Sequence, residues 1–305
     1  MIRDRGAAHS HLAPCRARVA ARRATVVATV LVATVVVATV TITTKVVATV
    51  LPARAATVRR ADAKAPSAPK PTKVARPAHP TTPSSTSALP TTAGRHKLNI
   101  TVNATRVLTT IVVPKGFKSG QRSPVLLAFP PGGQDDSLVE VGLDKYWAEG
   151  ARRGWIVISV AAPNGELFFQ GSELLIPSLL DQLASTYPPE GGRIHIGGIS
   201  NGGLSAFRVV LAHPERYASL VTLPGQPYDT SDNDRVPLLA KEKIPVFLGV
   251  GELDTVWREG SEKTAAALNK AGGKATLVIS PGDGHFISHI APATVWAFLE
   301  AARRR

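Results

Sequence analysis

The chain has 305 residues, enough for one large domain or two small ones, and carries a formal charge of +14. Residues 1–95 hold fifteen Lys and Arg against two acidic residues, whereas residues 96–305 hold twenty-one against twenty, so the basic excess lies outside the folded part and argues against nucleic acid as a partner. The only cysteine is Cys15, which excludes a disulfide within the chain and a cysteine-based metal site.

Residues 1–55 have the pattern of an export signal. A basic leader precedes residues 24–44, a run of twenty-one residues without charge, and Ala53-Arg54-Ala55 then offers a small-x-small cleavage site. The run is longer than an ordinary signal-peptide core and reaches the length of a membrane span. Both a cleaved signal peptide and a retained membrane anchor are therefore open, and both predict a protein that is secreted or anchored facing the extracellular side.

Residues 56–95 are rich in Pro, Ala, Thr, Ser and Lys. Such a segment buries too little apolar surface to offset its chain entropy, and its prolines favour an extended spacer. It is predicted to be a disordered linker. Its positive charge suggests that residues 1–95 associate with a membrane or with cell-wall material.

Residues 96–305 alternate short apolar runs with helical patterns. Strands are expected at 98–102, 106–113, 125–129, 155–160, 193–197, 218–223, 245–250 and 275–280, and helices at 143–153, 172–186, 202–212, about 261–271 and about 288–302. This alternation predicts one α/β domain with a mainly parallel, doubly wound sheet. Only about twenty residues separate Pro224 from Ile244, so no large lid domain is expected there.

The sharpest motif is Gly198-Ile199-Ser200-Asn201-Gly202, a G-x-S-x-G sequence between an expected strand and an expected helix. A serine on such a turn has strained backbone geometry, and its hydroxyl stands above the sheet. The alternative is a glycine-rich phosphate-binding turn, but neither G-x-G-x-x-G nor a G-K-[ST] ending is present. The motif therefore predicts that Ser200 is a nucleophile.

A serine nucleophile needs a base and an acid that orients this base, and in this strand–turn–helix context the chain order is Ser, acid, His. Asp254 and His285 each follow an expected strand, at the sheet edge where open α/β sheets bind ligands. Glu252 is the reserve acid, and Asp283 is expected to shape the histidine loop.

Six other histidines and aspartates are expected to have no catalytic role. Those expected to be structural or solvated are His195, His213, His289, Asp229, Asp232 and Asp234. The tetrahedral intermediate also needs two hydrogen-bond donors for its oxyanion. The expected donors are the backbone N–H of Asn201 and that of Gly133, with Gln134 as the next choice.

On these motifs the sequence resembles the α/β-hydrolase superfamily, and within it the polyhydroxybutyrate depolymerase and feruloyl-esterase-like branch. The resemblance covers residues 125–299, with its best stretches at 196–203, 213–215 and 251–256. The branch usually has His-Gly after the third strand, where this chain has Pro131-Gly132. The resemblance implies hydrolysis of carboxylic esters through an acyl-enzyme, without a metal or an organic cofactor.

The expected function is therefore a serine esterase with the triad Ser200, Asp254 and His285, acting outside the cytoplasm. An open site suits bulky or polymer-attached ester substrates. Two alternatives remain open at this point. One is an acyltransferase that acts on cell-envelope sugars or lipids, and the other is a non-catalytic wall-binding module on a hydrolase scaffold.

Overall fold

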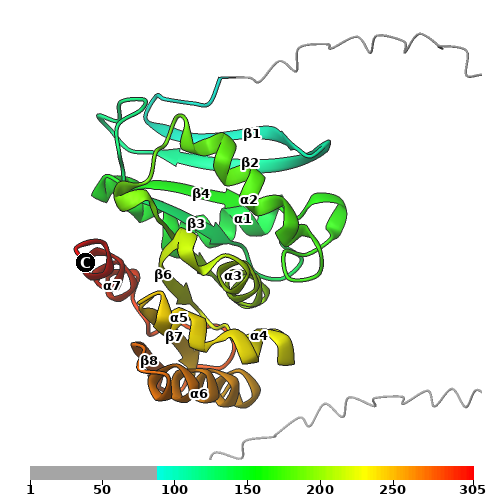
Figure 1. Cartoon of the computed structure of the whole chain (residues 1–305), viewed down its shortest axis with the longest axis vertical. Coiled ribbons are helices and arrows are strands. Elements are labelled where there is room, and N and C mark those ends of the chain that lie inside the picture. The colour runs from blue at the N-terminus through cyan, green and yellow to red at the C-terminus, as the bar shows by residue number, and fades with distance from the viewer. Residues whose placement is uncertain (1–87) are drawn as a thin grey trace, which may run out of the picture. The chain divides into compact units, whose positions relative to one another are not determined.

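The computed structural model describes residues 88–305, so the predictions for residues 1–87 lie outside the described part. One eight-stranded sheet has the order β1-β2-β4-β3-β5-β6-β7-β8 (Figure 1). Its strands are β1 (Gly94–Val102), β2 (Thr105–Val113), β3 (Val125–Phe129), β4 (Ile156–Val160), β5 (Ile194–Gly198), β6 (Tyr217–Thr222), β7 (Val246–Gly251) and β8 (Ala275–Ser280). The pairs β1–β2 and β2–β4 are antiparallel, and every later pair is parallel. This confirms the predicted mainly parallel α/β fold.

Helices cover both faces of the sheet (Figure 1). They are α1 (Asp136–Gly142), α2 (Ile176–Ala184), α3 (Asn201–Ala212), α4 (Thr230–Arg235), α5 (Pro237–Lys241), α6 (Thr255–Lys270) and α7 (Pro292–Arg303), with a π-helical turn (Leu143–Trp147) and a 3₁₀ helix (Ala148–Arg153) after α1. Between β6 and β7 the chain forms only α4 and α5, so this segment holds no large lid domain. Residues 88–305 contain no helix that is both long and apolar enough to span a membrane.

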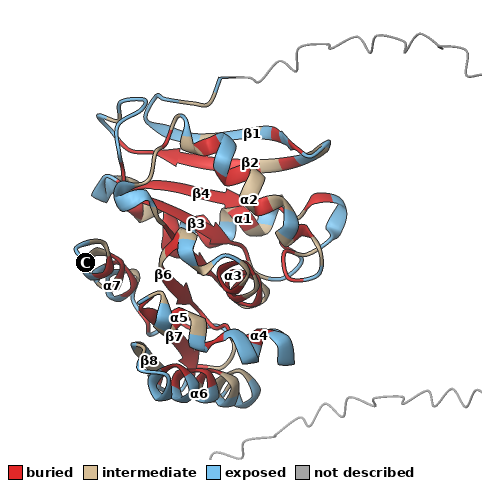
Figure 2. Cartoon of the chain, viewed as in Figure 1, coloured by how far each residue is buried: buried red, intermediate tan, exposed pale blue. Residues whose placement is uncertain are grey.

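The central strands are continuous apolar runs because both of their faces are covered, as parallel sheets require (Figure 2). Along β3, Val125, Leu127 and Phe129 contribute to a core that includes residues of α2, α3 and α6. Leu126 and Ala128 contribute to a second core, which includes residues of α1 and α7. Because successive side chains of β3 point to opposite faces of the sheet, this one strand contributes to both cores.

The structure differs from the predictions at Asp232 and at the starts of two helices, whereas Asp229 and Asp234 are exposed, as expected. The stretch around Asp229, Asp232 and Asp234 forms α4, and Asp232 is only 1% exposed. Asp229 caps this helix by accepting from the Asp232 backbone N–H, while the Asp232 carboxylate pairs with Arg208. The helix expected near 261 begins at Thr255, directly after Asp254, and the last helix begins at Pro292, because proline suits a first helical turn.

Candidate active site

Ser200 lies on the sharp turn between β5 and α3. Its φ is 55° and its ψ is −119°, a strained conformation for a residue with a side chain. A Cβ at Gly198 would collide with the carbonyl oxygen of Gly202, and one at Gly202 would collide with that of Phe129. The flanking glycines are therefore required by close backbone packing.

The three residues selected as a triad come together at the carboxyl edge of the sheet. The hydroxyl of Ser200 lies 2.7 Å from Nε2 of His285, and Nδ1 of His285 lies 2.6 Å from Oδ2 of Asp254. Ser200 follows β5, Asp254 follows β7, and His285 lies in the loop between β8 and α7, the histidine loop. The His285 side chain is 36% exposed and that of Asp254 is 12% exposed, so the imidazole is open to solvent while the carboxylate is sheltered.

The carboxylate of the reserve acid Glu252 has a partner other than His285. Its carboxylate accepts a hydrogen bond from the backbone N–H of Gly282 at 2.9 Å, and its own carbonyl accepts from Arg258. Asp254 begins α6 and is the carboxylate that contacts His285. The structure therefore brings the carboxylate of Asp254, and not that of Glu252, to His285.

Asp283 organises the histidine loop, as expected. Its buried carboxylate accepts from the hydroxyl of Ser280 at 2.6 Å, from the backbone N–H of Ser288 at 2.7 Å and from that of His289 at 2.9 Å. These hydrogen bonds to the charged form hold the pKa of Asp283 well below its usual range. The carbonyl of Asp283 also accepts from Leu253 at 2.8 Å, which joins the histidine loop to the loop that carries the acid.

Two backbone N–H groups, those of Asn201 and Gly133, are the candidate oxyanion donors. Within residues 88–305, the N–H groups of Asn201 and Gly133 have no protein acceptor. The Asn201 side chain donates to the carbonyl of Gly132 at 2.9 Å, so the two segments are in direct contact. Gln134 is excluded as a donor, because its N–H bonds to Pro131 at 3.0 Å and its side chain is fully buried.

Exposed apolar side chains lie close to Asp254 and His285 in the sequence. Leu253, Val256 and Phe286 are 65%, 71% and 85% exposed, and each lies within two residues of Asp254 or His285. Trp257 lies against the histidine, with 5.2 Å between the ring centroids. Large exposed apolar residues that gather at one place indicate a binding surface.

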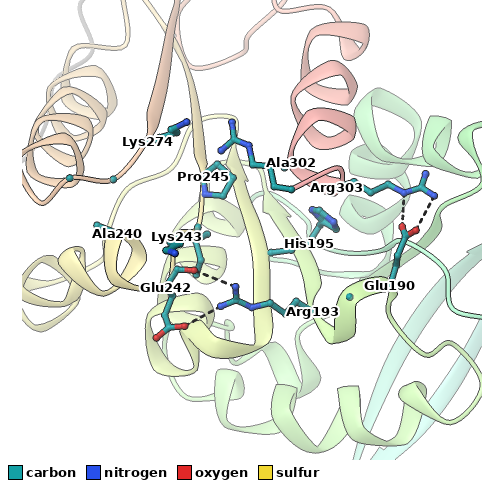
Figure 3. Close-up of a pocket in the computed structure, with 16 residues that line it drawn as sticks. Glu190, Arg193, His195, Ala240, Glu242, Lys243, Pro245, Lys274, Ala302 and Arg303 are labelled. Carbon is teal, nitrogen blue, oxygen red and sulfur yellow. Dashed lines mark hydrogen bonds and ion pairs between the residues drawn. The ribbon is translucent and has the colours of Figure 1, made fainter.

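No cluster of three or more His, Cys, Asp or Glu side chains suited to a metal occurs in the described part of the chain. A cavity of about 830 Å³ lies at the opposite, amino edge of the sheet (Figure 3). Its basic side chains include Arg193, which pairs with Glu242, and Arg303, which pairs with Glu190. None of the predicted site residues lines this cavity.

His195 lies at that cavity and is a buried core histidine, as expected. Its Nδ1 lies 2.7 Å from the hydroxyl of Ser219, the neighbouring residue on β6, and its ring packs edge-on against Trp155. Burial and the charge of Arg303 lower its pKa to about 4. His195 is therefore neutral at neutral pH, and no sequence signal marked Ser219 as its partner.

No protein-family model matches the chain, and no curated protein matches it. Solved structures do. A thermostable esterase matches 68% of the chain at 19% identity and a TM-score of 0.54, and a ferulic acid esterase matches 70% at 15% and 0.53. The fold is that of the α/β-hydrolases. Dipeptidyl peptidase 4 of Porphyromonas gingivalis is also similar, and it matches 69% of the chain at 13% identity and a TM-score of 0.55.

The three matched proteins differ from one another in how much of their length this chain covers. The match covers 60% of the thermostable esterase, 99% of the ferulic acid esterase and 35% of the dipeptidyl peptidase. The predicted α/β-hydrolase fold is thus confirmed. The narrower branch stays a prediction.

Proposed function

We propose that this chain is a serine hydrolase that cleaves carboxylic esters through an acyl-enzyme. The observation that carries the proposal is the continuous series of contacts from Ser200 through His285 to Asp254, at 2.7 and 2.6 Å. These separations lie in the range that proton transfer between a nucleophile and its base requires.

The contacts support a separate role for each group. Nε2 of His285 takes the proton of Ser200 as its Oγ attacks the ester carbonyl, and Asp254 stabilises the resulting imidazolium. The backbone N–H groups of Asn201 and Gly133 donate to the oxyanion. Collapse of the intermediate breaks the ester C–O bond, and the imidazolium donates its proton to the departing alcohol. A water molecule, deprotonated by His285, then releases the acid and frees Ser200.

The substrate is proposed to be a bulky or polymer-attached ester. Two observations support this: the segment between β6 and β7 is too short to cover the site, and Leu253, Val256 and Phe286 expose apolar surface beside it. The printed names of the thermostable and ferulic acid esterases agree with ester cleavage, whereas the dipeptidyl peptidase shows that the same fold also carries amide cleavage.

The protein is proposed to act outside the cytoplasm, with residues 1–55 as signal or anchor and residues 1–95 in contact with membrane or wall material. Mass spectrometry of the native N-terminus tests this part. A start at Ala56 supports a cleaved signal, and an intact leader in the membrane fraction supports an anchor. A full-length cytoplasmic protein would contradict both.

The activity is tested with a fluorophosphonate probe and with p-nitrophenyl esters of increasing chain length. The wild-type chain should label at Ser200 and should hydrolyse esters faster than matched anilides. If the chain hydrolyses the anilides faster than the esters, the proposed function changes from esterase to peptidase. Acyl transfer to an added alcohol in excess of hydrolysis would replace it with an acyltransferase.

A further inference from the structure

Gln134 is a fully buried polar residue in the turn after β3, the turn that also carries Gly133. Its φ of 55° lies in the left-handed region, which residues with a side chain adopt at a cost. Such a conformation persists only where the surroundings fix it from several directions. The contacts of Gln134 show what these directions are.

Three separate segments hold Gln134. Its Nε2 donates to the hydroxyl of Ser205 in α3 at 2.7 Å, and its Oε1 accepts from the backbone N–H of Phe168 at 2.9 Å. Its backbone carbonyl accepts from the N–H of Ala162 at 2.7 Å. Because the Phe168 N–H can only donate, this arrangement also fixes which end of the amide faces which partner.

The contacts continue into a closed ring around the proposed oxyanion donors. The Ser205 hydroxyl donates to the carbonyl of Asn201 at 3.1 Å, and the Asn201 side chain donates to the carbonyl of Gly132 at 2.9 Å. The backbone of Gly133 joins Gly132 to Gln134 and closes the ring. Both free N–H groups, those of Gly133 and Asn201, therefore belong to residues of this ring.

We propose that Gln134 is a positioning residue for the oxyanion site, acting through Ser205 and the side chain of Asn201 to fix the spacing of the two donors. The proposal rests on the proposed serine-hydrolase function. Donors stabilise a developing oxyanion most when they are held in place before the reaction, and a fully satisfied buried network provides such rigidity. Gln134 itself touches neither the substrate nor the nucleophile.

The test uses the full-length chain with Gln134→Met, which keeps the size of the side chain but removes both amide hydrogen bonds, and with Ser205→Ala, which opens the ring elsewhere. Rates are expressed per active site, counted by fluorophosphonate labelling, so that unfolded molecules do not contribute. Each variant should lower kcat by about 10- to 100-fold, with KM changed by less than about 3-fold. The double variant should lose little more than the worse single one.

A trifluoromethyl ketone separates positioning from a merely structural role. Its hemiketal oxyanion uses the same donors, so its inhibition constant should rise by the factor by which kcat/KM falls. Ser219→Ala is the matched control, because it removes an equally short hydrogen bond of a buried serine at the other edge of the sheet. It should lower the melting temperature while kcat per active site stays unchanged.

Two results would overturn the inference. If Gln134→Met and Ser205→Ala lower only the melting temperature, and kcat/KM per site and inhibitor affinity match those of the wild type, Gln134 is structural alone. If the wild-type chain shows no labelling that depends on Ser200, the proposed function fails and this inference fails with it. Should Gln134→Met not fold, Ser205→Ala carries the same test.

Discussion

Two serine–histidine pairs stand at opposite edges of the same sheet. At the carboxyl edge the hydroxyl of Ser200 lies 2.7 Å from His285, and at the amino edge that of Ser219 lies 2.7 Å from His195. The contact distance is the same, so the distance alone does not distinguish a reactive pair from a structural one.

The surroundings of the two histidines make the difference. His285 has the Asp254 carboxylate on its other nitrogen and is one-third exposed. His195 is 3% exposed, and its burial and the positive charge of Arg303 both disfavour its protonated form (Figure 3). A general base must accept a proton during the reaction, and of the two histidines only His285 has a carboxylate within hydrogen-bond distance.

The largest effect expected separates the two serines. Ser200→Ala should abolish fluorophosphonate labelling and lower ester kcat by roughly 10⁴- to 10⁶-fold, because the proposed nucleophile is lost. Ser219→Ala should keep kcat per active site. Labelling and steady-state kinetics on both variants measure this. Labelling that persists at another serine in Ser200→Ala would remove the assignment of the nucleophile.

The second prediction concerns the orienting acid. Asp254→Asn should reduce kcat by roughly 10⁴-fold with a much smaller change in KM, because the amide favours the wrong imidazole tautomer. Glu252→Gln is the matched control on the same loop and should have a small effect, since Glu252 contacts Gly282 and not the base. If Glu252→Gln lowers kcat strongly and Asp254→Asn lowers it only slightly, Asp254 is not the orienting acid.

The third prediction concerns the loop that carries the base. Asp283→Asn should lower kcat by between about 10- and 100-fold, because the amide cannot accept all the hydrogen bonds that fix the position of His285. The folded-state pKa of Asp283 is depressed, so its stabilisation is present above the unfolded pKa and is lost as the pH falls below about 4. Urea unfolding at pH 2 to 6 should show this slope in the wild type and a shallower one in the variant. Equal slopes would contradict the assignment.

The smallest effect is expected for the Ser219–His195 pair, and it should appear in the free energy of unfolding. The pKa of His195 is lowered to about 4, so between about pH 4 and pH 6.5 the unfolded chain binds the additional proton. The free energy of unfolding should therefore fall as the pH drops through this window, by up to about 3 kcal/mol. His195→Gln should remove this part of the slope and leave kcat per site unchanged, as chemical denaturation and kinetics would report. A loss of activity without a change in slope would place His195 in the reaction.

Local patterns in the sequence predicted the fold and the three groups at the carboxyl edge. Continuous apolar runs marked the buried strands, and the G-x-S-x-G motif between a strand and a helix marked Ser200. Asp254 and His285 followed from chain order and from their positions after strands. Each of these signals is a short local pattern or the order of such patterns along the chain.

What sequence reasoning missed depends on partners far apart in the chain. Gln134 is held by Phe168 and Ser205, 34 and 71 residues away, and no local pattern records such contacts. His195 meets Ser219 only because β5 and β6 pair in that register. The burial of Asp232 had a local signal, since Asp229 three residues earlier is a helix cap, but the stretch was interpreted by polarity alone.

The proposed nucleophile and its base lie on parts of the sheet that differ in protection. Ser200 follows β5, which is buried along its whole length between two neighbours, whereas the histidine loop follows β8, a partly exposed strand at the edge. Edge segments open at a lower free energy than the core. Amide hydrogen exchange should therefore be faster in β8 and the histidine loop than in β5, and on heating the catalytic rate should decline before the circular dichroism of the sheet changes. Uniform exchange across β5 and β8 would mean that the molecule loses its chemistry and its fold in a single step.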